Sequence, residues 1–182
     1  RETSGVMLVS KNDATHLKLS ELFSQRQINK TYLCLVTGKV KNSSGEIKTF
    51  FDRHPKERKL FSSRGEKGRQ AHTKWQVKRR FKGITELEVH PKTGRTHQIR
   101  VHCCEHLFPI LSDSLYGQRR LARFYRQKEF AALKKAMERL ALHALSIEFS
   151  HPTIGDTIKI SATPPQDYQK AIEYLEKNYH LE

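Results

Sequence analysis

The sequence predicts a single domain of the α+β class, in which helices flank a largely antiparallel sheet. Two pairs of strand-like segments, 71–81 with 84–91 and 142–152 with 156–165, favour antiparallel pairing because short turn sequences separate their members. Residues 165–179 instead carry apolar side chains at helical spacing. The chain has 182 residues and shows neither internal repeats nor low-complexity linkers, so residues 1–182 are expected to form one domain.

The first forty residues predict a strand, a helix and a second strand. The apolar segment 5–10 is typical of a buried strand. Residues 13–27 are expected to form a helix, with Asn12 or Asp13 as its N-cap. The apolar positions of this helix are Ala14, Leu17, Leu22 and Phe23. Segment 30–38 is rich in β-branched and aromatic residues, which favours a strand.

The middle of the chain predicts three more strands and a second helix. The strands are expected at 47–51, 71–81 and 84–91. The basic segment 53–70, with its many charges and glycines, is expected to be a loop or a weak hairpin. Thr96 is a candidate N-cap for a helix that continues past Leu107 until Pro109 ends it.

The stretch from 118 to 139 is basic and amphipathic, which predicts a helical insert. Its apolar side chains are Leu121, Phe124, Tyr125, Phe130, Leu133 and Met137. Two strands and the helix at 165–179 are expected to complete the domain. The apolar positions of that helix are Tyr168, Ile172 and Leu175.

The chain is strongly basic. Lys and Arg together number 34 against 19 Asp and Glu, which gives a net charge of +15 and a pI of about 9.9. Such an excess predicts a polyanionic partner, because neutralising phosphates releases counterions and drives binding. Nucleic acid is therefore the expected partner, with RNA and DNA both open. The alternative is a basic surface that serves only solubility.

Three cysteines, Cys34, Cys103 and Cys104, bear on the compartment. An odd number with two adjacent members is not a disulfide framework, which favours a reducing compartment such as the cytoplasm. No apolar run approaches the roughly 18 residues of a membrane span, so no membrane partner is expected. The chain begins with Arg1, and because translation normally starts at Met, a piece of a longer protein is expected.

The segment HPKTGRTHQIRVHCCEH, residues 90–106, concentrates histidines beside a cysteine pair. His102 and His106 have the i, i+4 spacing of residues on one helical face, which suggests a metal site. Zinc sites usually take ligands from two separated clusters, however, and no second cluster completes this one. The sequence therefore favours core or solvated histidines with buried thiols, and no metal.

The same segment also suits a pocket for a polyanion and a nucleobase. Arg95, His97, Gln98 and Arg100 fall where a loop meets the start of the expected helix. Free backbone N–H groups there favour anions, and the arginine fork matches phosphate. The alternative is a solvated helix start with Arg100 in a structural ion pair, and the residues alone leave the two equally open. Support for a serine or P-loop enzyme is weak, since neither motif occurs.

Five blocks of sequence extend almost from end to end of the chain. They are ETSGVMLVSKN (2–12), INKTYLCLVTG (28–38), TGRTHQIRVH (93–102), PILSDSLYG (109–117) and LALHALSIEFSHPTIGDTIKISATPPQDY (140–168). In content and order they resemble the RluA family of RNA pseudouridine synthases. The resemblance implies the pseudouridine synthase fold and the isomerisation of specific uridines in rRNA or tRNA, without metal or organic cofactor. Two departures are Ser112, where the family usually has Gly, and the insert at 118–139.

The catalytic block of the family places a third departure at the start of the chain. That block has the pattern R-L-D-x-x-T-S-G, in which the aspartate is the nucleophile, and RETSG supplies only its second half. The resemblance therefore implies an aspartate immediately before Arg1, together with preceding strands that this chain lacks. Glu2 cannot replace that aspartate by position. The 182-residue chain alone is expected to bind RNA without forming pseudouridine.

The resemblance also implies roles for individual residues. Tyr32 corresponds to the active-site tyrosine that stacks on the flipped base and assists proton removal at C5. Arg100 corresponds to the arginine that pairs with the catalytic aspartate, and without that aspartate it is expected to face an empty slot. Asp113 is expected to be structural. The expected RNA contacts are Lys30, Arg95, His97 and Gln98, the last three with loop support as an alternative. A monomer is expected, and the competing hypothesis is a non-catalytic RNA-binding module with the same fold.

Overall fold

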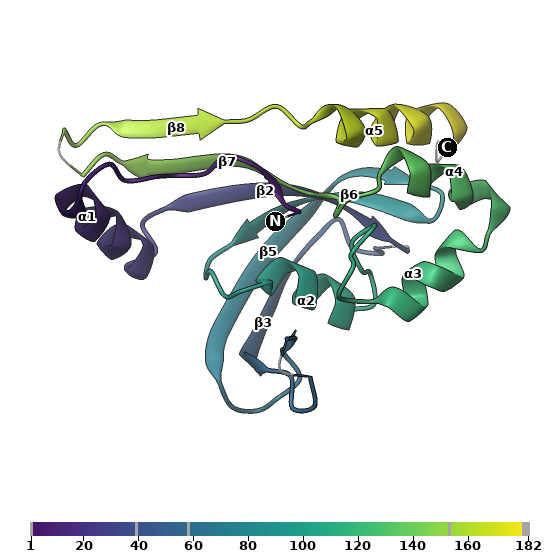
Figure 1. The fold of residues 1–182 in the computed structure, drawn as a ribbon, viewed down its shortest axis with the longest axis horizontal. Coiled ribbons are helices and arrows are strands. Elements are labelled where there is room, and N and C mark those ends of the chain that lie inside the picture. Colours follow the sequence, from purple (N-terminus) through teal and green to yellow (C-terminus); the bar gives the residue numbers. More distant parts are fainter. Residues whose placement is uncertain (1, 39, 58, 153, 180–182) are drawn as a thin grey trace.

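Eight strands form one strongly twisted sheet in the order β1-β7-β2-β6-β5-β3-β4, with β8 also paired to β7 (Figure 1). The computed structural model describes residues 2–38, 40–57, 59–152 and 154–179. The strands are β1 (Ser4–Gly5), β2 (Asn29–Thr37), β3 (Ser44–Arg53), β4 (Phe61–Ser62), β5 (Arg69–Phe81), β6 (Ile84–Pro91), β7 (Leu142–Ser150) and β8 (Thr157–Ser161). Only the pair of β1 with β7 is parallel, so the predicted α+β class with a largely antiparallel sheet is confirmed.

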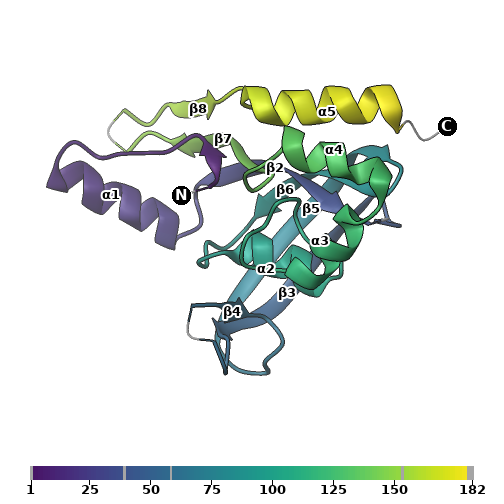
Figure 2. The same ribbon diagram turned by 45° about the vertical axis from the view of Figure 1, so that its right-hand side comes forward.

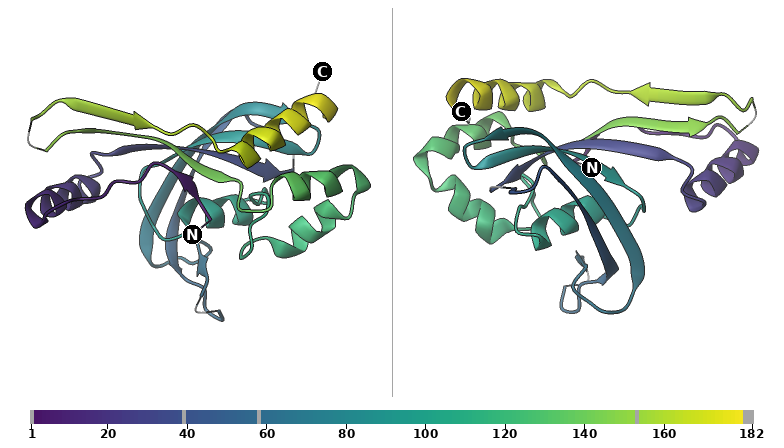
Figure 3. Two further views of the ribbon diagram at one scale, coloured as in Figure 1. Left: turned by 45° about the horizontal axis from the view of Figure 1, so that its top comes forward. Right: turned by 180° about the vertical axis from the view of Figure 1, so that it is seen from behind.

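Five helices occur in the described part of the chain: α1 (Asp13–Ser24), α2 (Gln98–Glu105), α3 (Gln118–Tyr125), α4 (Lys128–Ala136) and α5 (Gln166–Asn178). α2 lies against β5 and β6, while α4 packs on α3 and α5 (Figure 2). α1 lies at the opposite end of the molecule from α3 and α4, as both views of Figure 3 show. None of the described helices is long and apolar enough to cross a membrane.

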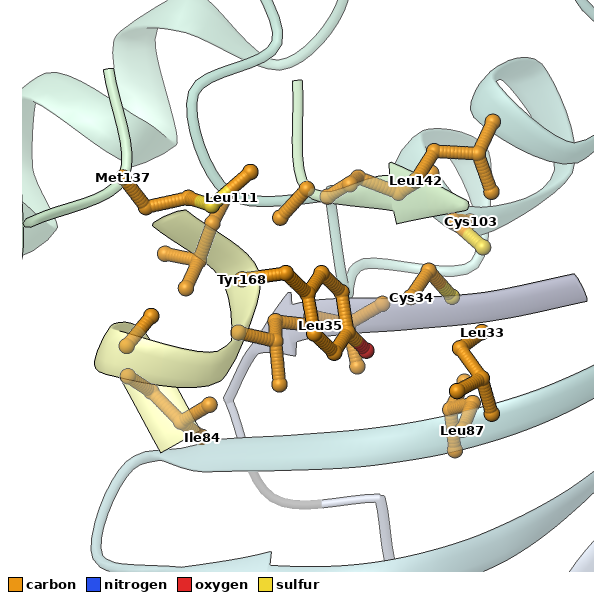
Figure 4. Close-up of a cluster of buried hydrophobic side chains, with 14 of the residues drawn as sticks. Leu33, Cys34, Leu35, Ile84, Leu87, Cys103, Leu111, Met137, Leu142 and Tyr168 are labelled. Carbon is orange, nitrogen blue, oxygen red and sulfur yellow. The ribbon is translucent and has the colours of Figure 1, made fainter. Parts of the chain in front are cut away.

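Strand β2 passes through the centre of the core, where all residues from Leu33 to Val36 are buried. Helices cover both of its faces, as the side chains in Figure 4 show. Leu33 borders Tyr168 of α5, whereas the Cys34 thiol is hydrogen-bonded to Cys103 of α2. A strand buried on both faces carries a continuous apolar run instead of an alternating one. This central strand also holds Tyr32 in place, one residue before the buried run.

The prediction of a strand at 5–10 is wrong beyond its first residue. β1 pairs with β7 only at Ser4 and Gly5, because β8 occupies the same edge of β7 from Ser146 onward. The following residues have no strand edge to join, and Met7 is 80% exposed. Alternate side chains of this segment still pack inward, onto a small apolar cluster shared with β7 and α1.

The helix predicted at 13–27 is present as α1, which ends at Ser24, three residues earlier than predicted. Asn12 is its N-cap, and the side chain of Asn12 accepts a hydrogen bond from the backbone N–H of Thr15 at 2.9 Å. The expected apolar face is less buried than predicted, since Leu17 is 69% and Phe23 45% exposed. Phe23 is instead directed towards a cavity described below.

The helical insert predicted at 118–139 is present as two helices, α3 and α4. The rings of Phe124 and Phe130 stack with their centroids 4.1 Å apart. Both rings lie against Gly83 in the turn between β5 and β6, where an added Cβ would come within 2.9 Å of Phe130. Gly83 also has a φ of +73°, so both space and backbone conformation favour glycine there. The insert is thereby fixed to the sheet.

Ser112 has a left-handed backbone with a φ of +57°, which explains why the family pattern usually has glycine at this position. Its side chain offsets part of the conformational strain. Ser112 Oγ donates a hydrogen bond to the carbonyl oxygen of Met137 and lies 3.1 Å from the hydroxyl of Tyr125. Ser112 therefore joins the loop before α3 to both helices of the insert.

Candidate active site

A cavity of about 450 Å³ lies where β1, β2, the end of β6 and the start of α2 meet. Its volume is within the range of about 300–1,000 Å³ that is common for small-molecule sites. The cavity is lined by all six residues that the sequence singles out as catalytic or RNA-binding, namely Lys30, Tyr32, Arg95, His97, Gln98 and Arg100. Glu2 and Thr3 also line it, so the amino-terminal segment reaches the same cavity.

Helix α2 begins directly after His97, which has a left-handed backbone with a φ of +60°. The prediction of Thr96 as the N-cap is wrong, because His97 occupies the cap position and makes no side-chain capping bond. The side chain of Gln98 holds the loop instead. Its Oε1 accepts hydrogen bonds from Arg95 N at 3.0 Å and from Thr93 Oγ1 at 2.6 Å.

The amide nitrogen of Gln98 is also engaged inside the protein. It donates to the carbonyl oxygen of His72 at 3.1 Å and to Thr73 Oγ1 at 2.9 Å, both on β5. Gln98 is only 3% exposed. With two bonds accepted and two donated, its amide has no capacity left for a base edge. This geometry favours the alternative of loop support over the expected RNA contact of Gln98.

The hydrogen-bond chain continues from Thr73 to His102, which is fully buried. Thr73 Oγ1 accepts from Gln98, so its own proton points at His102 Nδ1, 2.8 Å away. Nε2 of His102 then carries the imidazole proton and donates to Thr49 Oγ1 of β3 at 3.0 Å. Burial is the main reason that the pKa of His102 falls to about 4. Neutral His102 thus ties α2 to two strands of the sheet.

The lowered pKa of His102 predicts acid sensitivity. Since the pKa of about 4 in the fold lies below the ordinary value of 6.5, the unfolded chain binds the proton more readily. The free energy of unfolding should therefore fall by about 3 kcal/mol on account of His102 as the pH drops from 6.5 to 4. Urea titrations across this pH range on the wild type and on His102→Gln measure the contribution of His102 to the free energy of unfolding, because glutamine does not titrate.

The exposed His106 supplies the matched control, His106→Gln, at the end of the same helix. The free energy of unfolding of His106→Gln should depend on pH as that of the wild type does. A His102→Gln profile as steep as the wild-type profile would show that other groups cause the acid sensitivity.

Arg100 is held by a buried carboxylate. Its Nε and Nη2 donate to the two oxygens of Asp113 at 2.9 and 2.6 Å, and the side chains are 9% and 1% exposed. Asp113 Oδ1 also accepts the backbone N–H groups of Leu115 and Tyr116, which fixes the turn after α2. Burial opposes the charge of Arg100, but the hydrogen bonds and charge of Asp113 raise its pKa above the ordinary value.

Asp113 fills one edge of the Arg100 guanidinium, so the expectation that Arg100 faces an empty slot is wrong for this edge. The expected structural role of Asp113 agrees with the hydrogen bonds that it accepts. Nη1 of Arg100 has no hydrogen bond to any described residue, while Arg100 lines the cavity. Arg100 thus joins a structural ion pair on one edge to an open donor on the other.

Tyr32 and Lys30 extend from β2 into the cavity. Burial raises the pKa of the Tyr32 hydroxyl, which makes no hydrogen bond to the described residues. Burial and the nearby charge of Lys92 lower the pKa of Lys30. The ammonium of Lys30 lies 5.8 Å from the ring centroid of Phe23. The cavity therefore offers an aromatic hydroxyl beside a cation that a phosphate or carboxylate would stabilise.

Two further basic side chains form the α2 side of the cavity. Arg95 donates from Nε to the carbonyl oxygen of Gln70 at 3.1 Å, which anchors it to β5. His97 Nδ1 lies 3.1 Å from the hydroxyl of Tyr116, which itself accepts the backbone N–H of Phe61. The Tyr116 proton is thus available for Nδ1, leaving Nε2–H of His97 as a donor. Burial, followed by the charge of Arg100, lowers the pKa of His97 and favours this neutral form.

No group of three or more His, Cys, Asp or Glu side chains in the described part of the chain could hold a metal ion. The surroundings of Cys103 and Cys104 also do not suit a metal site or a reactive thiol. Cys103 is buried in the core against Cys34, and burial raises the pKa of Cys104 to about 11. Thiols in such surroundings are poor nucleophiles, because the thiolate is the reactive form.

Comparison with known proteins identifies the family to which this site belongs. Residues 1–105 match the family described as RNA pseudouridylate synthase. The chain belongs to this family. It is 36% identical over 178 residues to ribosomal large subunit pseudouridine synthase D of Xanthomonas campestris pv. campestris, covering 98% of this chain and 53% of that protein. It is 37% identical over 180 residues to an uncharacterized RNA pseudouridine synthase of Aquifex aeolicus, covering 98% and 55%.

The fold supports the same membership in the RNA pseudouridylate synthase family. The solved structure of human RNA Pseudouridylate Synthase Domain Containing 1 has a TM-score of 0.71 and 26% identity, covering 90% of this chain and 66% of that one. The chain spans about half the length of the curated relatives that it matches. The resemblance seen in the five sequence blocks is thereby confirmed at the level of family and fold.

Some features of the site of this family member were not predicted from the sequence. Phe23 and Thr93 line the cavity, and Asp113, which was expected only to be structural, is the partner of Arg100. A signal for Asp113 was available, since a buried arginine needs a carboxylate and SDSLYG supplies one shortly after α2. Phe23 carried no such signal, because an aromatic residue at helical spacing is expected in the core.

Proposed function

We propose that the protein containing this chain is an RNA pseudouridine synthase that acts on ribosomal RNA. The observation that carries the proposal is the convergence of Tyr32 and Arg100 with the amino-terminal Glu2 and Thr3 on one basic cavity. Family membership supports the reaction. Two relatives named for the large ribosomal subunit support rRNA over tRNA as the substrate.

The reaction needs no external redox or group donor. The C1′–N1 glycosidic bond of uridine breaks, the base turns, and C5 bonds to C1′. The C5 proton is lost and N1 gains a proton, so the product is an isomer of the substrate. A carboxylate near C1′ can stabilise or trap the positive charge that develops there, as in retaining glycosidases. The target base must leave the RNA stack to reach the cavity.

Each side chain has a defined task in this proposal. Tyr32 stacks on the flipped base, and its hydroxyl, which has no hydrogen bond to the described residues, assists removal of the C5 proton. Lys30, Arg95 and His97 bind the phosphates and base around it. Arg100 is a positioning residue whose Nη1 holds the catalytic carboxylate, while Asp113 fixes the other edge.

We further propose that this carboxylate belongs to an aspartate directly before Arg1. Arg1 itself lies outside the described residues, and the support for this proposal is that Glu2 and Thr3 line the cavity. Glu2 is engaged elsewhere, since its carboxylate accepts hydrogen bonds from Ser114 Oγ at 3.2 and 3.3 Å. We also propose that the protein is a monomer in the cytoplasm. The three free thiols support a reducing compartment.

The proposal is tested by incubating the full-length protein with unmodified large-subunit rRNA and, separately, with tRNA, and then mapping pseudouridine by carbodiimide adducts. Specific conversion in rRNA and none in tRNA is expected. Binding without conversion in either RNA would favour the non-catalytic RNA-binding module. The chain Arg1–Glu182 alone should bind RNA in a salt-dependent way without product, and detectable product from it would overturn the placement of the nucleophile.

A further inference from the structure

A second cavity, of about 310 Å³, adjoins the first and has no role in the proposed chemistry. It lies between the end of α1 and the paired strands β3 and β5. Its lining residues include Arg26, Lys48, Phe50, Gln70, His72 and Thr93. Thr93 lines both cavities, so only the loop after β6 separates them.

Arg26 has a backbone that glycine would adopt more readily. It follows α1 with a φ of +61°, and its N–H donates to the carbonyl of Phe23 at 3.2 Å while Gln27 N donates to that of Leu22 at 2.9 Å. These two bonds define the Schellman motif, in which glycine is the usual residue at the position of Arg26. A non-glycine residue held in this conformation stores strain, and such strain is concentrated at functional sites.

The guanidinium of Arg26 has no recorded hydrogen bond or ion pair with the described residues, and its exposed side chain borders this cavity. The other basic side chains there are already paired with a carboxylate. Lys48 Nζ lies 2.6 Å from one carboxylate oxygen of Glu46, and His72 Nε2 lies 3.0 Å from the other. Arg26 therefore offers a guanidinium without a carboxylate partner among the described residues, in a geometry suited to phosphate.

Phe50 provides an aromatic surface beside this cation. It is 43% exposed, although its neighbour Phe51 is only 4% exposed. Successive side chains of a strand point to opposite faces, so the packing of Phe51 near α2 directs Phe50 away from the core. Opposite Phe50 in the sheet lies Gln70, whose amide can bond a base edge. An exposed ring with a nearby arginine is the usual arrangement for stacking a nucleobase of single-stranded RNA.

We propose that this second cavity binds the nucleotide next to the uridine held in the first cavity, with the base on Phe50 and its phosphate on Arg26. The inference rests on the proposed function, because it requires single-stranded RNA at the neighbouring cavity. RNA reaching both cavities passes the Thr93 loop. The strain at Arg26 is then retained because glycine would lack the phosphate ligand.

The test measures binding of a fluorescent uridine heptaribonucleotide to chain Arg1–Glu182 by anisotropy at several salt concentrations. Phe50→Ala should weaken binding by about 5- to 150-fold, since stacking contributes about 1–3 kcal/mol per base. Phe50→Trp should retain binding. Arg26→Gly should weaken binding several-fold and lower the slope of log K against log salt by about 0.7, while raising the urea midpoint because the strain is relieved.

Lys41→Ala is the matched control, since it removes one exposed positive charge without lining either cavity. Lys30→Ala reports on the first cavity. If Lys30→Ala weakens binding while Phe50→Ala and Arg26→Gly behave like Lys41→Ala, the second site is refuted and the proposed function stands. If the wild-type chain does not bind the heptamer at any salt concentration, both fail.

Discussion

Arg100→Ala should lower the free energy of unfolding by about 3–5 kcal/mol, as expected when one partner of a buried ion pair is removed. The Asp113 carboxylate, which is 1% exposed beside Arg100, would lose its cation. Two backbone N–H groups still bond to it, which keeps the carboxylate in place instead of letting it turn to solvent. Urea denaturation followed by circular dichroism measures the loss. In the active full-length protein, the same change should also abolish most product formation.

The pair of Arg139 with Asp167 provides the control. It has the same bidentate chemistry, with Nε and Nη2 donating at 2.5 and 2.8 Å, but its side chains are 30% and 32% exposed. Arg139→Ala should cost about 1 kcal/mol or less, because water replaces the lost partner. Equal losses for the two variants would show that burial is not what makes the Arg100 pair strong.

Tyr32→Ala should abolish most activity of the full-length protein, whereas Tyr32→Phe should lower kcat by about 100-fold or more with little change in KM. Phenylalanine keeps the ring that stacks on the base but lacks the hydroxyl proposed to assist C5 deprotonation. Alanine removes both, so KM should rise as well. Steady-state kinetics with an rRNA fragment separate the two effects. Near-normal turnover of Tyr32→Phe would remove the hydroxyl from the mechanism and leave stacking alone.

The pH profile gives an independent check on Tyr32. Burial raises its pKa above the ordinary value of 10.0, so the phenol is neutral at pH 7 and the phenolate fraction grows only in alkaline solution. If the phenolate is the base, kcat should keep rising with pH beyond 9 in the wild type. In Tyr32→Phe, kcat should not change with pH over the same interval, because this variant has no hydroxyl proton to lose.

Much of the sheet could be predicted from the sequence, because the signals were local. The turn at Gly83 separates two long strand-like segments and sets their register from Phe81 to Arg79, beyond which a β-bulge before Val77 shifts it. Asn12 could be placed as an N-cap because its side-chain bond to Thr15 N spans only three residues. The convergence of Tyr32 with Arg100 could be predicted only from the resemblance to a family, because hydrophobic periodicity does not indicate which distant residues meet at a site.

Other features depend on partners distant in the sequence and could not be predicted. Segment 5–10 has the composition of a strand, but β8 takes the sheet edge that it would need. Gln98 resembles a base-reading residue until its four bonds to the surrounding protein are known. Thr96 resembles an N-cap, yet the left-handed His97 occupies that position. Each error comes from tertiary contacts that outweigh local preference.

The position of Glu2 and Thr3 in the cavity wall has a practical consequence for RNA-binding experiments on the chain Arg1–Glu182. A purification tag fused directly before Arg1 would continue a segment that lines the cavity, and it would compete with RNA there. Weak RNA binding caused by such a tag would be mistaken for a weak site. No described residue of α5 lines the cavity, so a tag placed after Glu182 of this chain is the better choice.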